Sequence, residues 1–360
     1  MQWAWWYTWY FFLNVVCSAT TSGSGCTIDA PCRVMGSCEP DPRQNLTPLE
    51  TFRCTNRTTL GAITLPPGSG FGSSFLQVLD GIAAALQLDI CFFIDERYSH
   101  LRHASWKSFW SKYFEPMGIP VPAASMFRGF EGGRWIDGRH PFLQLSAWRK
   151  QKGVVELRTP LNPGGFVHRV ALQETSLKHV LHGQGLTAKQ ELVRKVIRYR
   201  AWVGNSICSR FSALGLRPDY IAITVRRGDK VLEVRAGHAV AAPISWYVQI
   251  IEHLSGEDVP QVFVATDDAS SVQELRDYRP RWEILSVSPA NETGFVLSTL
   301  STLSASNIKE QQLKHFLELH ALANARYFVG TQTTTVTKMG QILRRDKADN
   351  TTIIVEDFKP

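Results

Sequence analysis

The feature that most constrains the fold is an alternation of short apolar runs with amphipathic stretches after residue 218. The apolar runs have the length of buried strands and lie at 220–225, 262–265, 283–286 and 327–329. The amphipathic stretches have helical spacing and lie at 243–254, 271–278, 310–324 and 335–343. Strands that alternate with helices form a parallel sheet with right-handed crossovers. This alternation therefore predicts a Rossmann-like α/β layer in the C-terminal part of the chain.

A similar succession of helical and apolar stretches occurs once upstream, in a less regular form. A glycine-containing turn at 66–72 precedes a helical pattern at 75–88 and an apolar run at 90–94. A long helix or a broken pair of helices is expected over 186–214. We therefore predict an α/β protein with two Rossmann-type halves, an N-terminal half at 65–214 and a C-terminal ligand-binding half at 215–360.

Residues 1–19 carry no charged side chain and are crowded with aromatic and aliphatic residues. This pattern predicts a secretory signal peptide, or a signal anchor that stays uncleaved and holds the protein at a membrane. Either one places the rest of the chain in a lumen or outside the cell, so we expect the Golgi or endoplasmic reticulum lumen or secretion. The net charge of +7 does not select a partner, and no basic run with interleaved aromatics predicts nucleic-acid binding.

Residues 20–64 are rich in cysteine and polar residues, and we expect a loop region held by disulfides. Four cysteines fall close together, at Cys26, Cys32, Cys38 and Cys54. They predict two local disulfides with three alternative pairings, whereas zinc binding lacks a C-x-x-C pair or a nearby histidine. Cys91 and Cys208 could pair but are expected in the core. Glycosylation acceptors occur at Asn45, Asn56, Asn291 and Asn350.

Polar clusters follow three of the predicted strands, at 226–230, 266–268 and 330–335. Ligands of parallel sheets bind at the carboxyl ends of the strands, so these clusters predict one anionic-ligand site. Arg226 and Arg227 offer planar forks for phosphate, and Lys230 adds a point charge. A threonine turn that opens a helix offers backbone N–H groups to an anion, and it consists of Thr333, Thr334 and Thr335.

The remaining candidate residues are two glycines and three carboxylates, and each carboxylate has two interpretations. Gly70 and Gly72 would let the backbone approach a ligand closely. Asp229 and Asp268 either orient the arginines or contact the ligand. Glu318 either reads guanine, whose edge offers two adjacent N–H donors, or lies on a solvated helix surface. A P-loop motif does not occur in the sequence.

Three of these motifs resemble, in order and spacing, those of the α1,6-fucosyltransferases. Residues 225–230 are similar to the family's V-R-R-T-D-K signature, with Gly228 in place of Thr, and 262–268 resemble its apolar strand ending A-T-D-D. Residues 317–320 and 328–331 resemble its L-D-x-H element and following strand, and 70–72 resemble its donor-side loop. The resemblance covers roughly 65–115 and 215–345. It implies a GT-B-like fold, a GDP-fucose donor, a glycan acceptor, inversion at the anomeric carbon and no required metal.

The resemblance also implies roles for single residues. Arg226 would contact the diphosphate, and Lys230 would neutralise the β-phosphate with help from Thr334. Glu318 would read guanine. Other donor-site residues would be Gly70, Phe71, Gly72, Arg227, Asp229, Tyr247, Asp267, Asp268, Thr333 and Thr335, of which Asp267 and Asp268 would support the arginine loop.

Two positions depart from the family pattern. Thr224 stands where the family has a histidine beside the base, and Val234 stands where the family has its catalytic carboxylate. We expect Glu233, one residue earlier, to act as general base on the acceptor hydroxyl. Two alternatives remain. One is a protein O-fucosyltransferase, a related architecture with a polypeptide acceptor, and the other, which these departures favour, is a catalytically silent protein that binds a sugar nucleotide or glycan.

Overall fold

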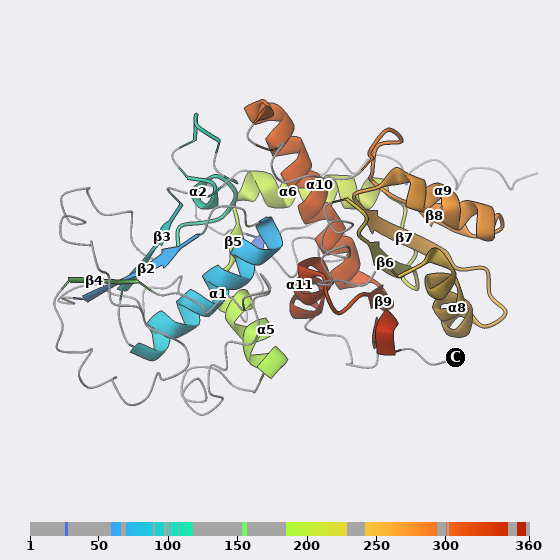
Figure 1. The fold of residues 1–360 in the computed structure, drawn as a ribbon, viewed down its shortest axis with the longest axis horizontal. Helices are drawn as coiled ribbons and strands as arrows, with labels where there is room; N and C mark the ends of the chain where they lie inside the picture. The colour runs from blue at the N-terminus through green and yellow to red at the C-terminus, as the bar shows by residue number, and fades with distance from the viewer. Residues whose placement is uncertain are drawn as a thin grey trace, which may run out of the picture.

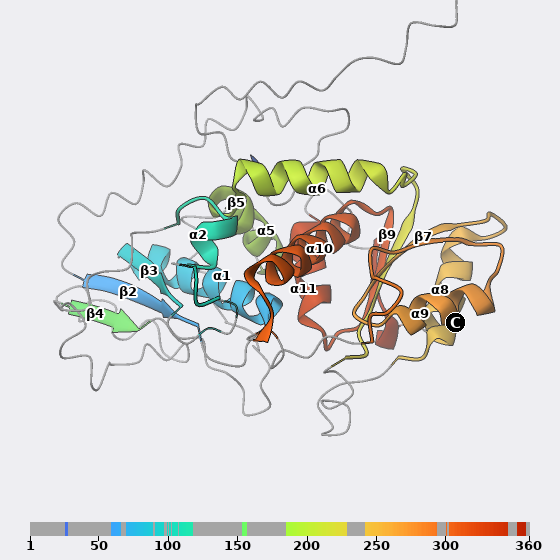
Figure 2. The ribbon, with the colours of Figure 1, turned by 90° about the horizontal axis from the view of Figure 1, so that it is seen from above.

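Two parallel sheets lie at opposite ends of the protein, with helices packed between them in both views of the computed structural model (Figures 1 and 2). The structure describes residues 26–27, 59–65, 70–88, 91–96, 99, 101, 103–106, 108–117, 153–156, 185–228, 242–293, 300, 302–344 and 351–357. The predictions for the N-terminal segment 1–19, for three of the four clustered cysteines and for Asn45, Asn56 and Asn350 lie outside these residues.

The N-terminal sheet has β2 (Thr59–Thr64) at its centre, paired in parallel with β3 (Cys91–Asp95) and β4 (Gly153–Glu156). Helix α1 (Phe71–Leu88) connects β2 to β3. The adjacent side chains Phe92 and Phe93 are both fully buried, so β3 is covered on both faces as its continuous apolar run predicted.

Two predictions for this half are wrong. The strand β2 lies before residue 65, in the stretch expected to be disulfide-held loop, because its alternation of Thr, Gly and Ala gives a weak strand signal. Helix α1 begins at Phe71, four residues earlier than expected. Phe71 and Gly72 therefore belong to the first helical turn, and only Gly70 remains in the turn before it.

The segment 185–214 forms the broken helix pair that the sequence predicted. Helix α5 (Gly185–Val196) and helix α6 (Ala201–Ala213) flank β5 (Arg198–Tyr199), which pairs antiparallel with β1 (Cys26–Thr27). A short helix α2 (Trp110–Tyr113) lies beside them. The pair ends near Gly215, whose positive φ of 63° suits a residue without Cβ.

The C-terminal sheet is parallel throughout and has the strand order β10-β9-β6-β7-β8. Its strands are β6 (Ile221–Val225), β7 (Gln261–Thr266), β8 (Glu283–Leu285), β9 (Tyr327–Gly330) and β10 (Thr352–Ile354). The crossover helices are α8 (Ile244–Ser255), α9 (Ala269–Tyr278), α10 (Ala305–Asn324) and α11 (Thr335–Leu343). This confirms the predicted layer; β10 and the short 3₁₀ helix η5 (Val355–Asp357) were not predicted.

The two faces of this sheet belong to different cores. Ile221, Ile223 and Val225 of β6 pack with α8 and α9, whereas Ala222 faces the core that contains α10 and α11. Successive strand residues point to opposite faces, and this alternation decides on which side each polar residue beyond the strand emerges. Because the chain passes from β8 back across to β9, strand order reverses between β6 and β9.

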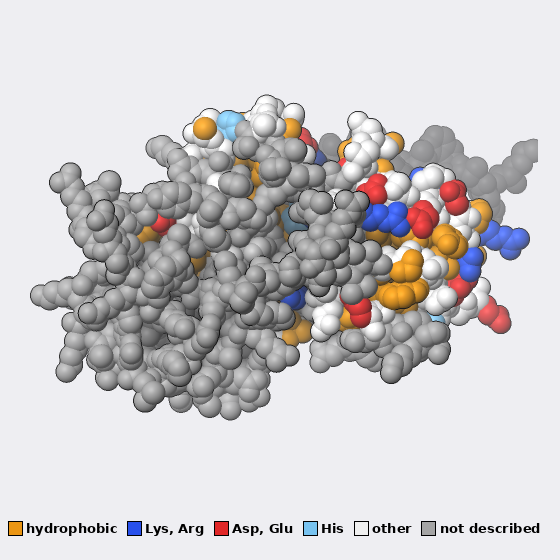
Figure 3. Space-filling model, viewed as in Figure 1, with side chains coloured by type: hydrophobic (Ala, Val, Ile, Leu, Met, Phe, Trp, Pro, Cys, Tyr) orange, Lys and Arg blue, Asp and Glu red, His pale blue; other side chains and the backbone are white. Residues whose placement is uncertain are grey.

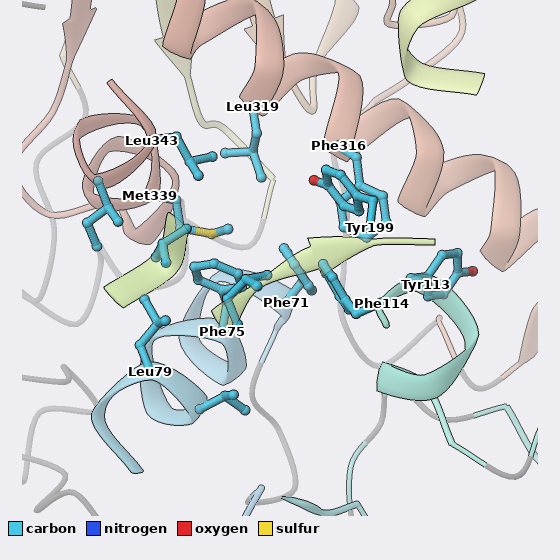
Figure 4. Packing of buried hydrophobic residues seen from close by; sticks show 14 of the residues in the cluster. Phe71, Phe75, Leu79, Tyr113, Phe114, Tyr199, Phe316, Leu319, Met339 and Leu343 are labelled. Atoms are coloured by element: carbon cyan, nitrogen blue, oxygen red, sulfur yellow. The ribbon is translucent and has the colours of Figure 1, made fainter. Parts of the chain in front are cut away.

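Both halves share one aromatic core at their junction (Figure 4). Phe71 of α1 meets Phe316 of α10 with ring centroids 5.1 Å apart, and Phe316 lies 5.1 Å from Tyr199. Met339 and Leu343 of α11 belong to the same cluster. The two halves are therefore continuous through buried side chains.

Cys208 on α6 is disulfide-bonded and half-buried, so the expectation of a core thiol is wrong for this residue. A disulfide fits the extracytoplasmic placement that the sequence predicted. Among the described residues, no helix is both long enough and apolar enough to span a membrane.

Candidate nucleotide-sugar site

Three polar segments leave the C-terminal sheet at one edge. Val225 pairs with Thr266, and Ile223 pairs with Val329, so β6, β7 and β9 end side by side. The edge includes the reversal point between β6 and β9, which is where open α/β sheets bind ligands. Gly330 lets Thr337 pack closely on this edge, because a Cβ built there would lie 2.5 Å from Oγ1 of Thr337 and 3.0 Å from Cγ2 of Thr224.

Asp267 organises the loop that follows β6. Its carboxylate accepts the N–H of Arg227 at 2.9 Å and the N–H of Gly228 at 3.1 Å. The same group forms an ion pair with Arg226, with Nε to Oδ2 at 3.4 Å. Asp267 is only 4% exposed, so the carboxylate forms a buried anchor for the arginine loop. This confirms that Asp267 supports the loop.

The two arginines have different surroundings. Arg227 donates through Nη2 to Glu274 of α9 at 2.6 Å, on the α8–α9 side of the sheet. Arg226 follows the parity of Ala222 and therefore belongs to the opposite side, towards the N-terminal half. In Figure 3 basic side chains lie next to acidic ones over the C-terminal half. Arg227 is thus paired with Glu274 and Arg226 with Asp267, and the phosphate contact of Arg226 stays a prediction.

Asp268 does not join the arginine loop. It caps α9, accepting the N–H of Ser270 at 3.0 Å and its hydroxyl at 2.8 Å. The prediction that both aspartates support the arginines is therefore wrong for Asp268, because its carboxylate is turned to the helix that it begins.

The threonine turn begins α11, and its members differ. Thr334 is the N-cap and accepts the N–H of Thr337 at 3.1 Å, so its hydroxyl serves the helix. Thr333 and Thr335 are half-buried. Thr335 faces α1: a Cβ on Gly72 would lie 2.7 Å from its Oγ1. The first turns of α1 and α11 therefore meet beside the sheet edge, with their partial positive charges close together.

Glu356 in the C-terminal segment bonds to the backbone just before the threonine turn. Glu356 of η5 accepts the N–H of Gln332 through both carboxylate oxygens, at 3.2 and 3.1 Å. Tyr247, expected near the donor, is a core residue on the α8 side, where its hydroxyl donates to the carbonyl of Thr224 at 3.0 Å. Burial raises the pKa of the Tyr247 hydroxyl.

Glu318 is 7% exposed, so the solvated-surface reading of this carboxylate is wrong. Its Oε1 lies 3.7 Å from Nζ of Lys314, and its Oε2 lies 3.7 Å from Nδ1 of His315. Lys314 also pairs with Glu292 and donates to the carbonyl of Thr266 at 3.3 Å. These contacts place Lys314, and with it His315 and Glu318 of the same helix, at the end of β7 beside the arginine loop.

Several predicted residues are not brought to this edge by the structure. The side chain of Phe71 is buried in the aromatic core and meets the ring of His315 edge-on. Asp229, Lys230 and Glu233 lie outside the described residues. Asn291 is exposed, as a glycosylation acceptor must be.

Sequence reasoning missed Lys314, His315 and Glu356. The i, i+3 and i, i+4 spacing of Lys314 and His315 to Glu318 was a usable signal for the first two. Among the described residues, no group of three or more His, Cys, Asp or Glu side chains is placed to hold a metal ion.

The two parallel sheets and the reversal of strand order between β6 and β9 are those of a GT-B-like α/β fold. Residues 177–353 match the family model for α-(1,6)-fucosyltransferase N- and catalytic domains, so this segment, which holds the C-terminal sheet, is similar to that family.

Solved structures agree in fold. Arabidopsis thaliana FUT1, as a variant bound to GDP, is 13% identical with a TM-score of 0.52, over 85% of this chain and 73% of that one. Fucosyltransferase NodZ from Bradyrhizobium is 14% identical with a TM-score of 0.49, over 79% of this chain and 93% of that one. POFUT1 bound to GDP-fucose is 13% identical with a TM-score of 0.44, over 83% and 98%. The similarity to the Arabidopsis structure supports the assignment of the fold.

Proposed function

We propose that this protein transfers fucose from GDP-fucose to a glycan acceptor, with inversion at the anomeric carbon. The observation that supports this most is the ion pair of Arg226 with the buried carboxylate of Asp267, at the edge where strand order reverses. A fixed guanidinium there stabilises the charge that develops on a departing diphosphate. The adjoining first turns of α1 and α11 add N–H groups of the same polarity.

The proposed reaction combines Arg226 with the roles that the family resemblance implies for Lys230, Glu233 and Glu318. The oxygen of an acceptor hydroxyl attacks C1 of fucose while the bond from C1 to the β-phosphate oxygen breaks. The bonding electrons leave with GDP, whose added charge Arg226 and Lys230 compensate. Glu233 takes the proton of the attacking hydroxyl. The buried carboxylate of Glu318 accepts the N1–H and 2-amino protons of guanine.

Adjacent arginines give a matched test. Arg226→Ala should lower the turnover number by at least about 100-fold, the usual effect of removing one fixed donor to developing charge. Arg227→Ala removes the same side chain one residue away and should change turnover by less than about threefold, because its partner is Glu274 on the outer helix. GDP release and labelled fucose on the product are the measurements. Near-normal turnover of Arg226→Ala, with unchanged thermal stability, would disprove the proposed role of Arg226 in the mechanism.

The acceptor class needs its own experiment. We propose a free glycan, and a panel of GlcNAc-terminated cores, chito-oligosaccharides and folded Ser/Thr-containing polypeptides separates the alternatives. Mass spectrometry should find fucose on the glycans. Fucose on Ser or Thr instead would identify a protein O-fucosyltransferase, and GDP-fucose binding without any transfer would identify a silent binding protein.

We also propose that the enzyme acts in the secretory pathway, anchored by or released from residues 1–19. The disulfide at Cys208 and the exposed sequon at Asn291 support this placement. The expressed full-length chain should shift in electrophoretic mobility after N-glycosidase treatment. Cytosolic, unglycosylated and fully reduced protein would contradict it.

A further inference from the structure

The ring of His315 is held in a fixed orientation beside the carboxylate of Glu318. Its Nδ1 lies 3.7 Å from Oε2 of Glu318, one helical turn away on α10. Its ring meets the ring of Phe71 edge-on, with centroids 5.5 Å apart and planes at 82°. The side chain is 19% exposed. A hydrogen-bond donor and an acceptor are thus set side by side, with part of the ring open to solvent.

The carboxylate itself has capacity for a ligand. Oε1 of Glu318 is buried and accepts no hydrogen bond from any residue in the described parts of the chain. The neighbouring Lys314 is held by Glu292 and by the carbonyl of Thr266, which draws its ammonium towards the end of β7. Of these two described neighbours of Glu318, His315 is therefore the one that can offer an N–H donor to a bound base.

The edge of guanine matches this pair. It presents the O6 acceptor next to the N1–H and 2-amino donors, so a carboxylate on the donors leaves O6 facing the adjacent protein group. We propose that His315 donates a hydrogen bond to guanine O6 and is a specificity-determining residue of the donor site. This inference rests on the proposed function, in which Glu318 reads the N1–H and 2-amino groups.

Adenine is rejected by the same pair. Adenine places an amino donor where guanine has O6, and an acceptor nitrogen where guanine has N1–H. The donor of His315 would then face a donor, and the carboxylate of Glu318 would face an acceptor. Each mismatch leaves a buried polar group without its partner.

The test compares three nucleotides by isothermal titration calorimetry on the full-length protein. GDP carries all three groups, 6-thio-GDP weakens only the O6 acceptor, and IDP lacks only the 2-amino group. The wild type should bind GDP about tenfold more tightly than 6-thio-GDP. His315→Ala should weaken GDP about tenfold and leave 6-thio-GDP nearly unchanged, so that the preference disappears.

Two further variants complete the design. His315→Gln keeps an N–H donor and should restore much of the preference for GDP over 6-thio-GDP. His253→Ala removes an exposed histidine of α8 and should match the wild type. The ratio of GDP to IDP affinity should be the same in the wild type and His315→Ala, because Glu318 reads the 2-amino group.

The inference fails if His315→Ala weakens GDP and 6-thio-GDP by the same factor, or weakens neither. The first result would show that His315 only supports the packing around Phe71. Both results leave the proposed function standing, because the wild type would still bind GDP and transfer fucose. Absence of GDP binding by the wild type would instead overturn the proposed function and the inference together.

Discussion

The consecutive carboxylates Asp267 and Asp268 hold different parts of the protein, and alanine substitutions should separate their effects. Asp267 accepts two backbone N–H groups of the arginine loop and pairs with Arg226. Asp268 accepts the N–H and hydroxyl of Ser270 at the start of α9. One substitution should therefore release the loop at the site, and the other should loosen a helix end.

The magnitudes follow from the bonds that are lost. A hydrogen bond to a charged acceptor contributes about 1.5–3 kcal/mol, and Asp267→Ala removes two of them. The loop residues Arg227 and Gly228 are half-buried, so water recovers part of this, and we expect a net loss of about 3 kcal/mol in positioning Arg226. That loss corresponds to a fall in kcat/KM of roughly 100-fold. Asp268→Ala should cost about 1 kcal/mol of stability, the usual value of an N-cap.

Steady-state fucosyl transfer and urea unfolding measure the two effects separately. Asp267→Ala should lose activity far beyond its loss of stability, whereas Asp268→Ala should keep activity within about threefold. The reasoning is refuted if Asp267→Ala retains wild-type kcat/KM. It is equally refuted if the two variants lose activity to the same extent, since the loop would then not depend on Asp267 specifically.

Gly72→Ala should lower the free energy of unfolding by about 1–3 kcal/mol in spite of the better helix propensity of Ala, because its Cβ would lie 2.7 Å from Oγ1 of Thr335. Gly70→Ala, with nothing within 4 Å of its Cβ, is the control, and equal stability of the two variants would contradict the close contact. Burial lowers the pKa of His320 to about 3, so the unfolded chain alone binds its proton between pH 6.5 and 3. Stability should therefore fall as the pH drops below about 6.5, by up to about 1.4 kcal/mol per pH unit, and urea titrations should show a weaker fall in His320→Gln.

The centre of the C-terminal sheet could be predicted because β6, β7 and β9 are buried on both faces. Such strands read as unbroken apolar runs, and those of β6, β7 and β9 end abruptly in polar residues. The site edge followed from the same pattern. By contrast, β2 was missed because Gly61 and Ala62 dilute its strand signal, and its identity depends on pairing with β3 and β4 far along the chain.

The errors at the site have a common origin in side-chain direction. Arg226 and Arg227 are chemically alike, and only the facing of the strand and the presence of Glu274 across it distinguish them. Gly72 was expected to let the backbone approach a ligand, whereas the structure shows that it lets α1 approach Thr335 of α11. Tyr247 carries the right chemistry for a ligand contact, yet the apolar face of α8 takes it into the core. Contacts between distant segments decided all three.

The aromatic core at the junction of the halves limits how the enzyme could be recombined with its relatives. Phe71 belongs to the N-terminal half by sequence, yet its ring packs on Phe316 of the C-terminal half. A chimera cut near residue 215 would separate these rings and leave large apolar faces without partners. The boundary between the two sheets is thus no boundary between folding units, and a chimera would have to keep the first turn of α1 together with the C-terminal half on which Phe71 packs.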